Sequence, residues 1–174
     1  MIANDSFGAH GIDHLSPSSL HTWAEAPALW IIERLLKKRS PMGAPGHAGT
    51  AVEAGIENGL MNANATDAEC IAIAMKRWRG LMALNYDGRK ARYDEAIPQM
   101  VVEGLNHLRP YGAPSHTQGD VSYQPEDLPV PIVGRYDFFW ADHNILTDLK
   151  TSLTLVSQIK VGHARQTALY KAAM

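Results

Sequence analysis

Residues 134–137, Gly134-Arg135-Tyr136-Asp137, and residues 148–150, Asp148-Leu149-Lys150, decide how this chain folds. The segments that contain them, 130–140 and 144–151, are rich in β-branched and aromatic residues, and polar residues stand between the two segments. This pattern predicts a β-hairpin. The hairpin carries one acid on its first strand, and an acid and a base on its second.

The register of this hairpin decides whether the two aspartates meet. A turn centred between Asp142 and His143 pairs residues whose numbers sum to 285, which places Asp137 opposite Asp148. Cross-strand neighbours have Cβ atoms about 4.5–5.5 Å apart, and like charges at that distance are destabilising. Two facing carboxylates therefore suggest a bound cation. Strand alternation also places Lys150 on the face of Asp148, roughly 7 Å along the strand.

Two alternatives stay open for the hairpin by itself. A turn with an odd number of residues would shift the register by one residue and place the two acids on opposite faces. An ordinary exposed hairpin with a solvated charged face also explains these residues equally well. Motifs elsewhere in the chain are needed to choose between these interpretations.

Further motifs precede and follow the hairpin in a fixed order. They are residues 16–20 (Ser-Pro-Ser-Ser-Leu), 26–30 (Ala-Pro-Ala-Leu-Trp), 49–53 (Gly-Thr-Ala-Val-Glu), and the pair Gln166 and Tyr170. With the hairpin motifs, this ordered set resembles the PD-(D/E)XK nuclease superfamily, and within it the RecB-type and phage-type exonucleases. The resemblance runs from about residue 15 to residue 170.

The resemblance implies a fold of the α/β (α+β) class. The expected architecture is a restriction-endonuclease-like core, in which helices flank a small mixed sheet, with a helical N-terminal half. The chain would form a single nuclease-like domain over residues 1–174. Residues 1–47 would supply N-terminal helices, and residues 48–174 the core, with a helical insertion at about 62–110.

The resemblance also implies a set of catalytic and metal-binding residues. Asp137 and Asp148 would be the central metal ligands, with the backbone carbonyl of Leu149 as a third and Glu53 completing the set. Lys150 would orient or help to deprotonate the attacking water. The implied cofactor is Mg²⁺ or Mn²⁺, because hard divalent cations prefer oxygen ligands.

Other residues are weaker candidates for the same site. Glu57 lies one helical turn after Glu53 and is its rival as a ligand, although the family position favours Glu53. Gln166 and Tyr170 would support the site or contact the DNA backbone, and a buried tyrosine bonded to a neighbour is nearly as good an interpretation. Arg135 would lie opposite Lys150, with a phosphate contact and a structural role equally open.

The sequence departs from the family pattern in two respects. Members with an iron–sulfur cluster hold it with four cysteines, one beside the N-terminal proline, whereas this chain has only Cys70, and Ala26 takes that position. A four-thiolate cluster within one chain is therefore excluded. The chain also ends at Met174, inside the helix that bears Gln166 and Tyr170, so the resemblance implies that the C-terminal end of the core is missing.

Composition limits the function classes further. The net charge of -2 and the isoelectric point near 6.4 do not indicate a nucleic-acid binder, so phosphate contacts would come from local clusters such as residues 37–39, 77–79 and 89–92. A run of charge is more often a solvated face. We find no apolar run long enough to span a bilayer and no signal-peptide pattern near the N-terminus, so we expect a cytoplasmic protein of a bacterium or a phage-infected cell.

The remaining secondary structure follows from caps and periodicity. Ser16-Pro17 and Pro27 predict two helix starts, and residues 48–60 predict a third helix after a loop at 40–46. Thr66 and Glu69 form a capping-box pattern for a helix toward Leu84. Pro98 is expected early in the next helix. Residues 120–124 predict the first strand, and residues 157–173 the final helix.

The leading hypothesis is a metal-dependent deoxyribonuclease, more specifically an exonuclease of phage or recombination and repair type. The alternative is a catalytically inactive nuclease-fold protein that binds nucleic acid or a protein partner. The sequence leaves open the polarity, the strand preference, DNA versus RNA, the physiological metal and the oligomeric state, including a homo-oligomer.

Overall fold

The structure is a computed structural model that describes residues 6–154 and 156–174, and its backbone contacts divide the chain into two compact units. We call residues 6–40, 120–135 and 157–174 the sheet-and-helix unit, and residues 41–119, 136–154 and 156 the helical unit. Each unit is described by itself. In the described part of the chain, no helix has the length and apolar character needed to cross a membrane.

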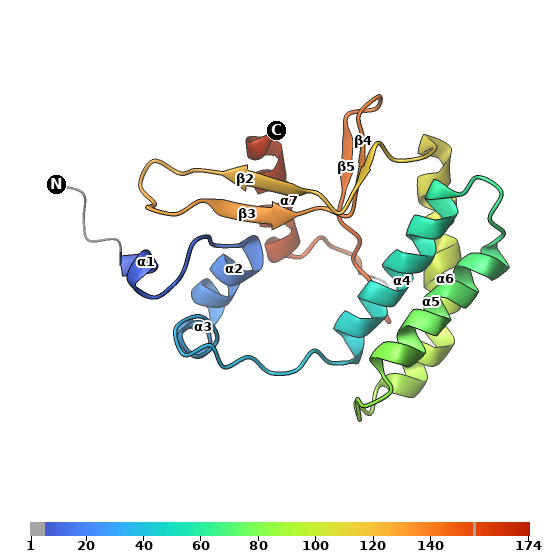
Figure 1. Ribbon diagram of the computed structural model, residues 1–174, viewed down its shortest axis with the longest axis horizontal. Coiled ribbons are helices and arrows are strands. Elements are labelled where there is room, and N and C mark those ends of the chain that lie inside the picture. The colour runs from blue at the N-terminus through green and yellow to red at the C-terminus, as the bar shows by residue number, and fades with distance from the viewer. Residues whose placement is uncertain (1–5, 155) are drawn as a thin grey trace. The chain divides into compact units, whose positions relative to one another are not determined.

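The core of the helical unit lies between helices α4 (Ala44–Met61), α5 (Asp67–Leu81) and α6 (Lys90–Leu108), which lie side by side (Figure 1). Small residues allow this close packing: a Cβ on Gly104 would lie 2.3 Å from Ile56 Cδ1. The most deeply buried side chains include Trp78, Ile97 and Leu105. The three helices therefore form a closely packed scaffold on which Phe138 and Trp140 also pack.

Local signals in the sequence explain where these helices begin. The predicted capping box is confirmed, because the Thr66 hydroxyl accepts from the Glu69 N–H while Glu69 accepts from the Thr66 N–H. The start of α4 is held by a carboxylate distant in sequence, since Asp87 Oδ2 accepts the Ala44 N–H at 2.9 Å. That long-range cap explains why α4 begins four residues earlier than predicted, inside the expected loop.

Helix α6 departs further from the prediction. It begins at Lys90, so Pro98 lies in its interior and not early in it. Interior proline removes a backbone hydrogen bond and usually breaks a helix. Here burial offsets that effect, because Tyr93 before the proline and Val101 after it both pack into the same core.

A three-stranded antiparallel sheet completes the helical unit, in the order β1 (His116–Thr117), β4 (Phe138–Trp140), β5 (Ile145–Thr147). A 3-10 turn at Arg109–Tyr111 leads from α6 toward it. Phe138 and Trp140 are buried in the helical core, so this face joins sheet to helices. The pairs Phe138 with Thr147, Phe139 with Leu146 and Trp140 with Ile145 confirm the predicted register, in which numbers sum to 285.

The sheet-and-helix unit has a smaller core, formed by Ile12, Leu15, Trp30, Val130 and Ile132. After the short helix α1 (Ser6–Ala9), α2 (Pro17–Glu25) and α3 (Pro27–Arg34) begin at the predicted prolines, and Ser16 caps α2 as predicted. Strands β2 (Asp120–Tyr123) and β3 (Ile132–Arg135) form an antiparallel ribbon, and α7 (Val161–Ala173) packs against it (Figure 1).

Three expectations for the strands need correction. The predicted strand 130–140 is two strands, β3 and β4, which belong to different sheets. The backbone changes partner between them: the Tyr136 N–H donates to Gly119 O, whereas the Asp137 N–H donates to Thr147 O. β2 is not the first strand, since β1 precedes it, and the expected mixed sheet is two antiparallel sheets with one isolated parallel bridge from Leu15 to Ile132.

Candidate functional site

Asp137 lies at the point where β4 begins, and it is half-buried. Its Oδ2 accepts the backbone N–H of Leu149, which joins the two halves of the sequence motif. Burial, together with the charges of Glu53 and Asp148, raises the pKa of Asp137 to about 6, against the lowering effects of the Leu149 hydrogen bond and the charge of Lys150. Asp137 is therefore a carboxylate for which the surroundings disfavour negative charge.

Asp148 and Lys150 follow β5 in an irregular segment. Lys150 Nζ forms an ion pair with Asp148 Oδ2, and the Asp148 side chain is only 12% exposed whereas that of Lys150 is 42% exposed. The expected regular strand therefore ends before both residues. Lys150 nevertheless reaches Asp148, because its long side chain extends back past Leu149, the one residue between them.

Glu53 projects from the middle of α4 and is half-buried. Its Oε1 accepts a hydrogen bond of 2.7 Å from Gln118 Nε2. The charge of Glu53 raises the pKa of Asp137. Among the described residues that affect this pKa, Glu57 is not included. The charges of Glu53, Asp148 and Lys150 thus all act on Asp137 within the helical unit.

Gln118 is a residue of this site that the sequence did not indicate. Besides binding Glu53, it donates its backbone N–H to Asp137 O at 2.8 Å. Its backbone is in the left-handed region, with φ of 51°, next to Gly119, where an added Cβ would lie 2.1 Å from the hydroxyl oxygen of Tyr136. A lone glutamine before a glycine carries no recognisable motif, so only the tertiary structure identifies it.

The donor set is chemically suited to a hard cation. Carboxylate oxygens are the ligands that Mg²⁺ and Mn²⁺ prefer, and a cation here would relieve the repulsion that acts on Asp137. Within residues 6–154 and 156–174, however, no three His, Cys, Asp or Glu side chains are gathered closely enough to hold one metal ion between them. The residues fit the cation by donor type and charge.

Gln166 and Tyr170 belong to the sheet-and-helix unit, where they support β3. Gln166 Nε2 donates to the Tyr170 hydroxyl, and that hydroxyl donates to Arg135 O, both at 2.5 Å. Tyr170 is 3% exposed, and its ring lies so close to Gly134 that an added Cβ would be 2.4 Å from Tyr170 Cε1. Gly134 of the hairpin motif and Tyr170 of the C-terminal motif are therefore in direct contact.

The expected place of Arg135 was wrong. It pairs with Asp120 across β2 and β3, where Arg135 Nε donates to Asp120 Oδ1 at 2.9 Å, and it does not lie opposite Lys150. The cause is the break between β3 and β4, since only β4 pairs with the strand that precedes Lys150. The Arg135 ion pair lowers the pKa of Asp120, chiefly through the side-chain hydrogen bond.

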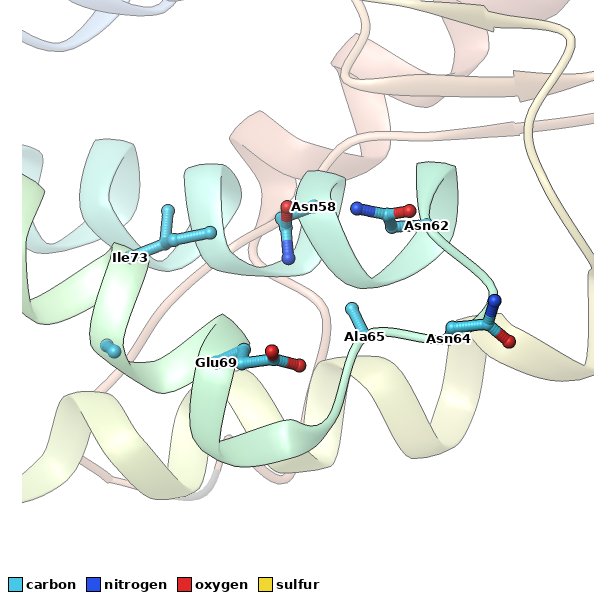
Figure 2. Close-up of a pocket in the computed structure, with 7 residues that line it drawn as sticks. Asn58, Asn62, Asn64, Ala65, Glu69 and Ile73 are labelled. Carbon is cyan, nitrogen blue, oxygen red and sulfur yellow. The ribbon is translucent and has the colours of Figure 1, made fainter.

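Two hollows lie in the described part of the helical unit, of which one includes residues of the candidate site and the other does not. A groove of about 440 Å³ is lined by Leu149 and Lys150 and continues along α4 and α6. Another, of about 490 Å³, lies between α4 and α5, where Asn58, Asn62 and Glu69 project into it (Figure 2). The second hollow shares no residue with the acidic site, and its carboxylate is engaged by Thr66.

The chain was compared with known proteins and protein families. Neither the curated proteins nor the solved structures included a match to it. The family profile of the PD-(D/E)XK nuclease superfamily matches residues 14–174, which includes all of the motifs described above. The chain belongs to the PD-(D/E)XK nuclease superfamily.

Proposed function

We propose that this protein is a metal-dependent nuclease that hydrolyses DNA phosphodiester bonds, with its catalytic residues in the helical unit. The observation that carries the proposal is the convergence of Asp137, Asp148 and Lys150, in which Leu149 joins the first acid to the segment bearing the other two residues. Membership of the nuclease superfamily supports the same reaction class.

Each residue has a distinct proposed role. Asp137, Asp148 and Glu53 supply oxygen ligands for Mg²⁺ or Mn²⁺, and the carbonyl of Leu149 adds another. The chemistry supplied by a bound divalent cation is Lewis-acid neutralisation of phosphate charge. Lys150 orients the attacking water and stabilises the negative charge that develops on the phosphate.

Residues around these groups act by holding them in place. Asp148 fixes the ammonium group of Lys150, and Gln118 fixes the carboxylate of Glu53. We assign Gln166, Tyr170 and Arg135 to supporting roles within the sheet-and-helix unit, because Gln166 binds the Tyr170 hydroxyl, which in turn holds the backbone of Arg135 in β3. In this proposal the two units act together as one nuclease-like domain.

The finer proposal is an exonuclease that processes DNA in phage growth or in recombination and repair, in the cytoplasm. It is supported by the RecB-type and phage-type pattern of motifs, from the helix start at Ser16 to Tyr170.

A second candidate is a nuclease-fold protein that binds nucleic acid or a partner without cutting. The low net charge and the lack of a tight three-ligand cluster in the described residues favour this alternative.

A cleavage assay tests the proposed reaction. Labelled linear DNA is incubated with Mg²⁺ or Mn²⁺ and with the wild type, Asp148→Ala or Lys150→Ala. We expect each substitution to reduce the rate by at least about 10² to 10³-fold, because each removes charge stabilisation from the transition state. Equal cleavage by all three proteins would overturn the mechanism.

Matched controls separate loss of chemistry from loss of structure. Asp142→Ala removes an exposed acid from the same hairpin, and Lys76→Ala removes an exposed base from α5. Both should cut at the wild-type rate.

Covalently closed circular DNA tests the finer proposal, since an exonuclease leaves it intact. Calorimetric titration with Mn²⁺ separates the alternative, because a protein that has lost catalysis need not bind the metal.

A further inference from the structure

The groove beside Lys150 has no role in the chemistry described above. It has a volume of about 440 Å³ and lies wholly within the helical unit, between α4, α6 and the segment that follows Lys150. Pockets for small organic ligands range from about 300 to 1,000 Å³, so this groove has room for one nucleotide-sized group. Its position makes it continuous with the proposed catalytic residues.

The floor and one wall of the groove are apolar. Val52 and Ile56 of α4 form the floor and are almost fully buried, and Leu153 packs against the same core from the other side. Gly104 has no side chain at the point where α6 meets Ile56, which leaves the helices in close contact there. Apolar surfaces of this kind suit the flat face of an aromatic ring.

The rim along α6 is polar. Gln99, Glu103 and His107 recur at four-residue intervals on one face of the helix, and all three are exposed. In the described part of the chain, none of these side chains forms a hydrogen bond or ion pair. They therefore offer an amide, a carboxylate and an imidazole to the edge of a ring that lies in the groove.

Charge also differs between the two ends of the groove. Lys150 places a cation at the end nearest the acids, whereas Glu103 places an anion on the α6 rim. A nucleotide has the matching arrangement: its phosphate is anionic, and the amino groups of its base donate hydrogen bonds. An all-apolar ligand would leave the Glu103 carboxylate without a complementary group, whereas the amino group of a base provides one.

We propose that this groove binds the nucleobase of the nucleotide next to the scissile phosphate. The inference rests on the proposed function and deepens it, because a base can enter the groove only if it has left its stack and its partner. The substrate is accordingly a single strand or an unpaired strand end, and an intact duplex must open at its end before it is cut.

Binding of small probes tests the groove without any cleavage. In the presence of EDTA, NMR titration compares deoxyadenosine 5′-monophosphate with 2-deoxyribose 5-phosphate, which lacks the base. We expect the nucleotide to bind at least about tenfold more tightly, since its base adds apolar contact with the floor of the groove and hydrogen bonds with the α6 rim. Equal binding of the two probes, or binding of neither, would overturn the proposal.

Two phenylalanine variants of α6 localise the effect. Ala96 lines the groove and is half-buried, so Ala96→Phe should fill it and abolish the preference for the nucleotide. Asn106 is exposed on the same helix outside the groove, so Asn106→Phe should keep the preference. Equal losses in both variants would contradict this location. If Ala96→Phe does not fold, the exposed double variant Gln99→Ala/His107→Ala replaces it and should reduce nucleotide affinity several-fold; unchanged affinity would count against the proposal.

The cleavage assay distinguishes this inference from the proposed function. If the wild type cuts linear DNA but cuts normal and abasic strand ends equally well, the groove does not read a base, and the nuclease proposal stands. If no DNA is cut, the nuclease proposal fails, while the titrations in EDTA still report on the groove.

Discussion

The helical unit and the sheet-and-helix unit differ in how much core they possess and in what they carry. Three long helices and the aromatic side chains of β4 form a wide core in the helical unit, whereas the described part of the other unit has a much smaller buried core. The unit with the wide core also holds Asp137, whose charged form is disfavoured by burial and by the charges of Glu53 and Asp148. A wide core offsets such a local unfavourable contribution to folding.

The comparison also separates two kinds of motif. Asp137, Asp148 and Lys150 belong to the unit that we propose performs the chemistry, whereas Gln166 and Tyr170 form internal contacts of the other unit. Substitutions in the first group should change activity more than stability. Substitutions in the second group should first change stability.

The largest expected effect compares one substitution in the two cores. Ile97→Ala, in the helical unit, should cost about 4 kcal/mol, because this side chain is fully buried among close-packed helices. Ile12→Ala should cost about 2 kcal/mol, because Ile12 borders an apolar hollow of about 360 Å³ and already lacks some neighbours. Urea denaturation of both variants measures the difference, and equal costs would refute the contrast in packing.

The second prediction concerns the contact between Gly134 and Tyr170. Gly134→Ala should destabilise the protein by about 1–3 kcal/mol, because the new methyl group overlaps a ring that is held by hydrogen bonds. In a Tyr170→Leu background the same change should cost less. Thermal melts of the four proteins measure the coupling, and additive effects would show that the overlap is relieved elsewhere. Gly80→Ala is the control, since its added Cβ would meet no atom within 4 Å apart from its chain neighbours and the backbone of its own helix.

The third prediction follows from the raised pKa of Asp137. In the metal-free protein its carboxyl takes up a proton on folding between about pH 4 and pH 6, so its contribution becomes less favourable as the pH rises through this range. Asp137→Asn should therefore stabilise the protein above pH 6 by about 1–2 kcal/mol, after allowance for solvent screening, and not at pH 4. Urea titrations in EDTA at both pH values measure this, while cleavage is lost. An equal effect at the two pH values would contradict the proposed cause.

The smallest effect is expected at the exposed ion pair of β2 and β3. The side chains of Arg135 and Asp120 are 67% and 54% exposed. Arg135→Gln should therefore change stability by less than about 0.5 kcal/mol, and the difference should vanish at high salt. Cleavage should stay within about twofold of the wild type, because an exposed surface charge contributes little. A large rise in KM at unchanged kcat would instead assign Arg135 to the DNA.

Much of the local structure was predictable because its causes lie within a few residues. The Ser16 cap, the capping box of Thr66 and Glu69, and the register of β4 with β5 were all predicted correctly. Each depends on neighbouring side chains or on a short turn. The start of α4 was not predictable in this way, since Asp87, the residue that caps it, lies far along the chain.

The residues of the candidate site also differ in whether the local sequence indicates them. Asp137, Asp148 and Lys150 were selected from their spacing together with the family resemblance, because the hairpin alone left its register open; the register of β4 with β5 is confirmed, and the catalytic roles stay a prediction. Gln118 could not be selected in this way, because its contact with Glu53 joins residues 65 positions apart and has no sequence signature. The place of Arg135 was wrong for a related reason, since the strand break at Tyr136 arises from hydrogen bonds to Gly119 and Thr147.

Sequence alone thus determined the hairpin that links residues 134–137 to residues 148–150 and its register, because periodicity and turn length act locally. Tertiary structure alone decided that this stretch is divided between two units and that the Gly134 backbone packs on Tyr170. It also decided that burial, with the charges of Glu53 and Asp148, raises the pKa of Asp137. Burial and charge depend on residues that meet only when the chain has folded.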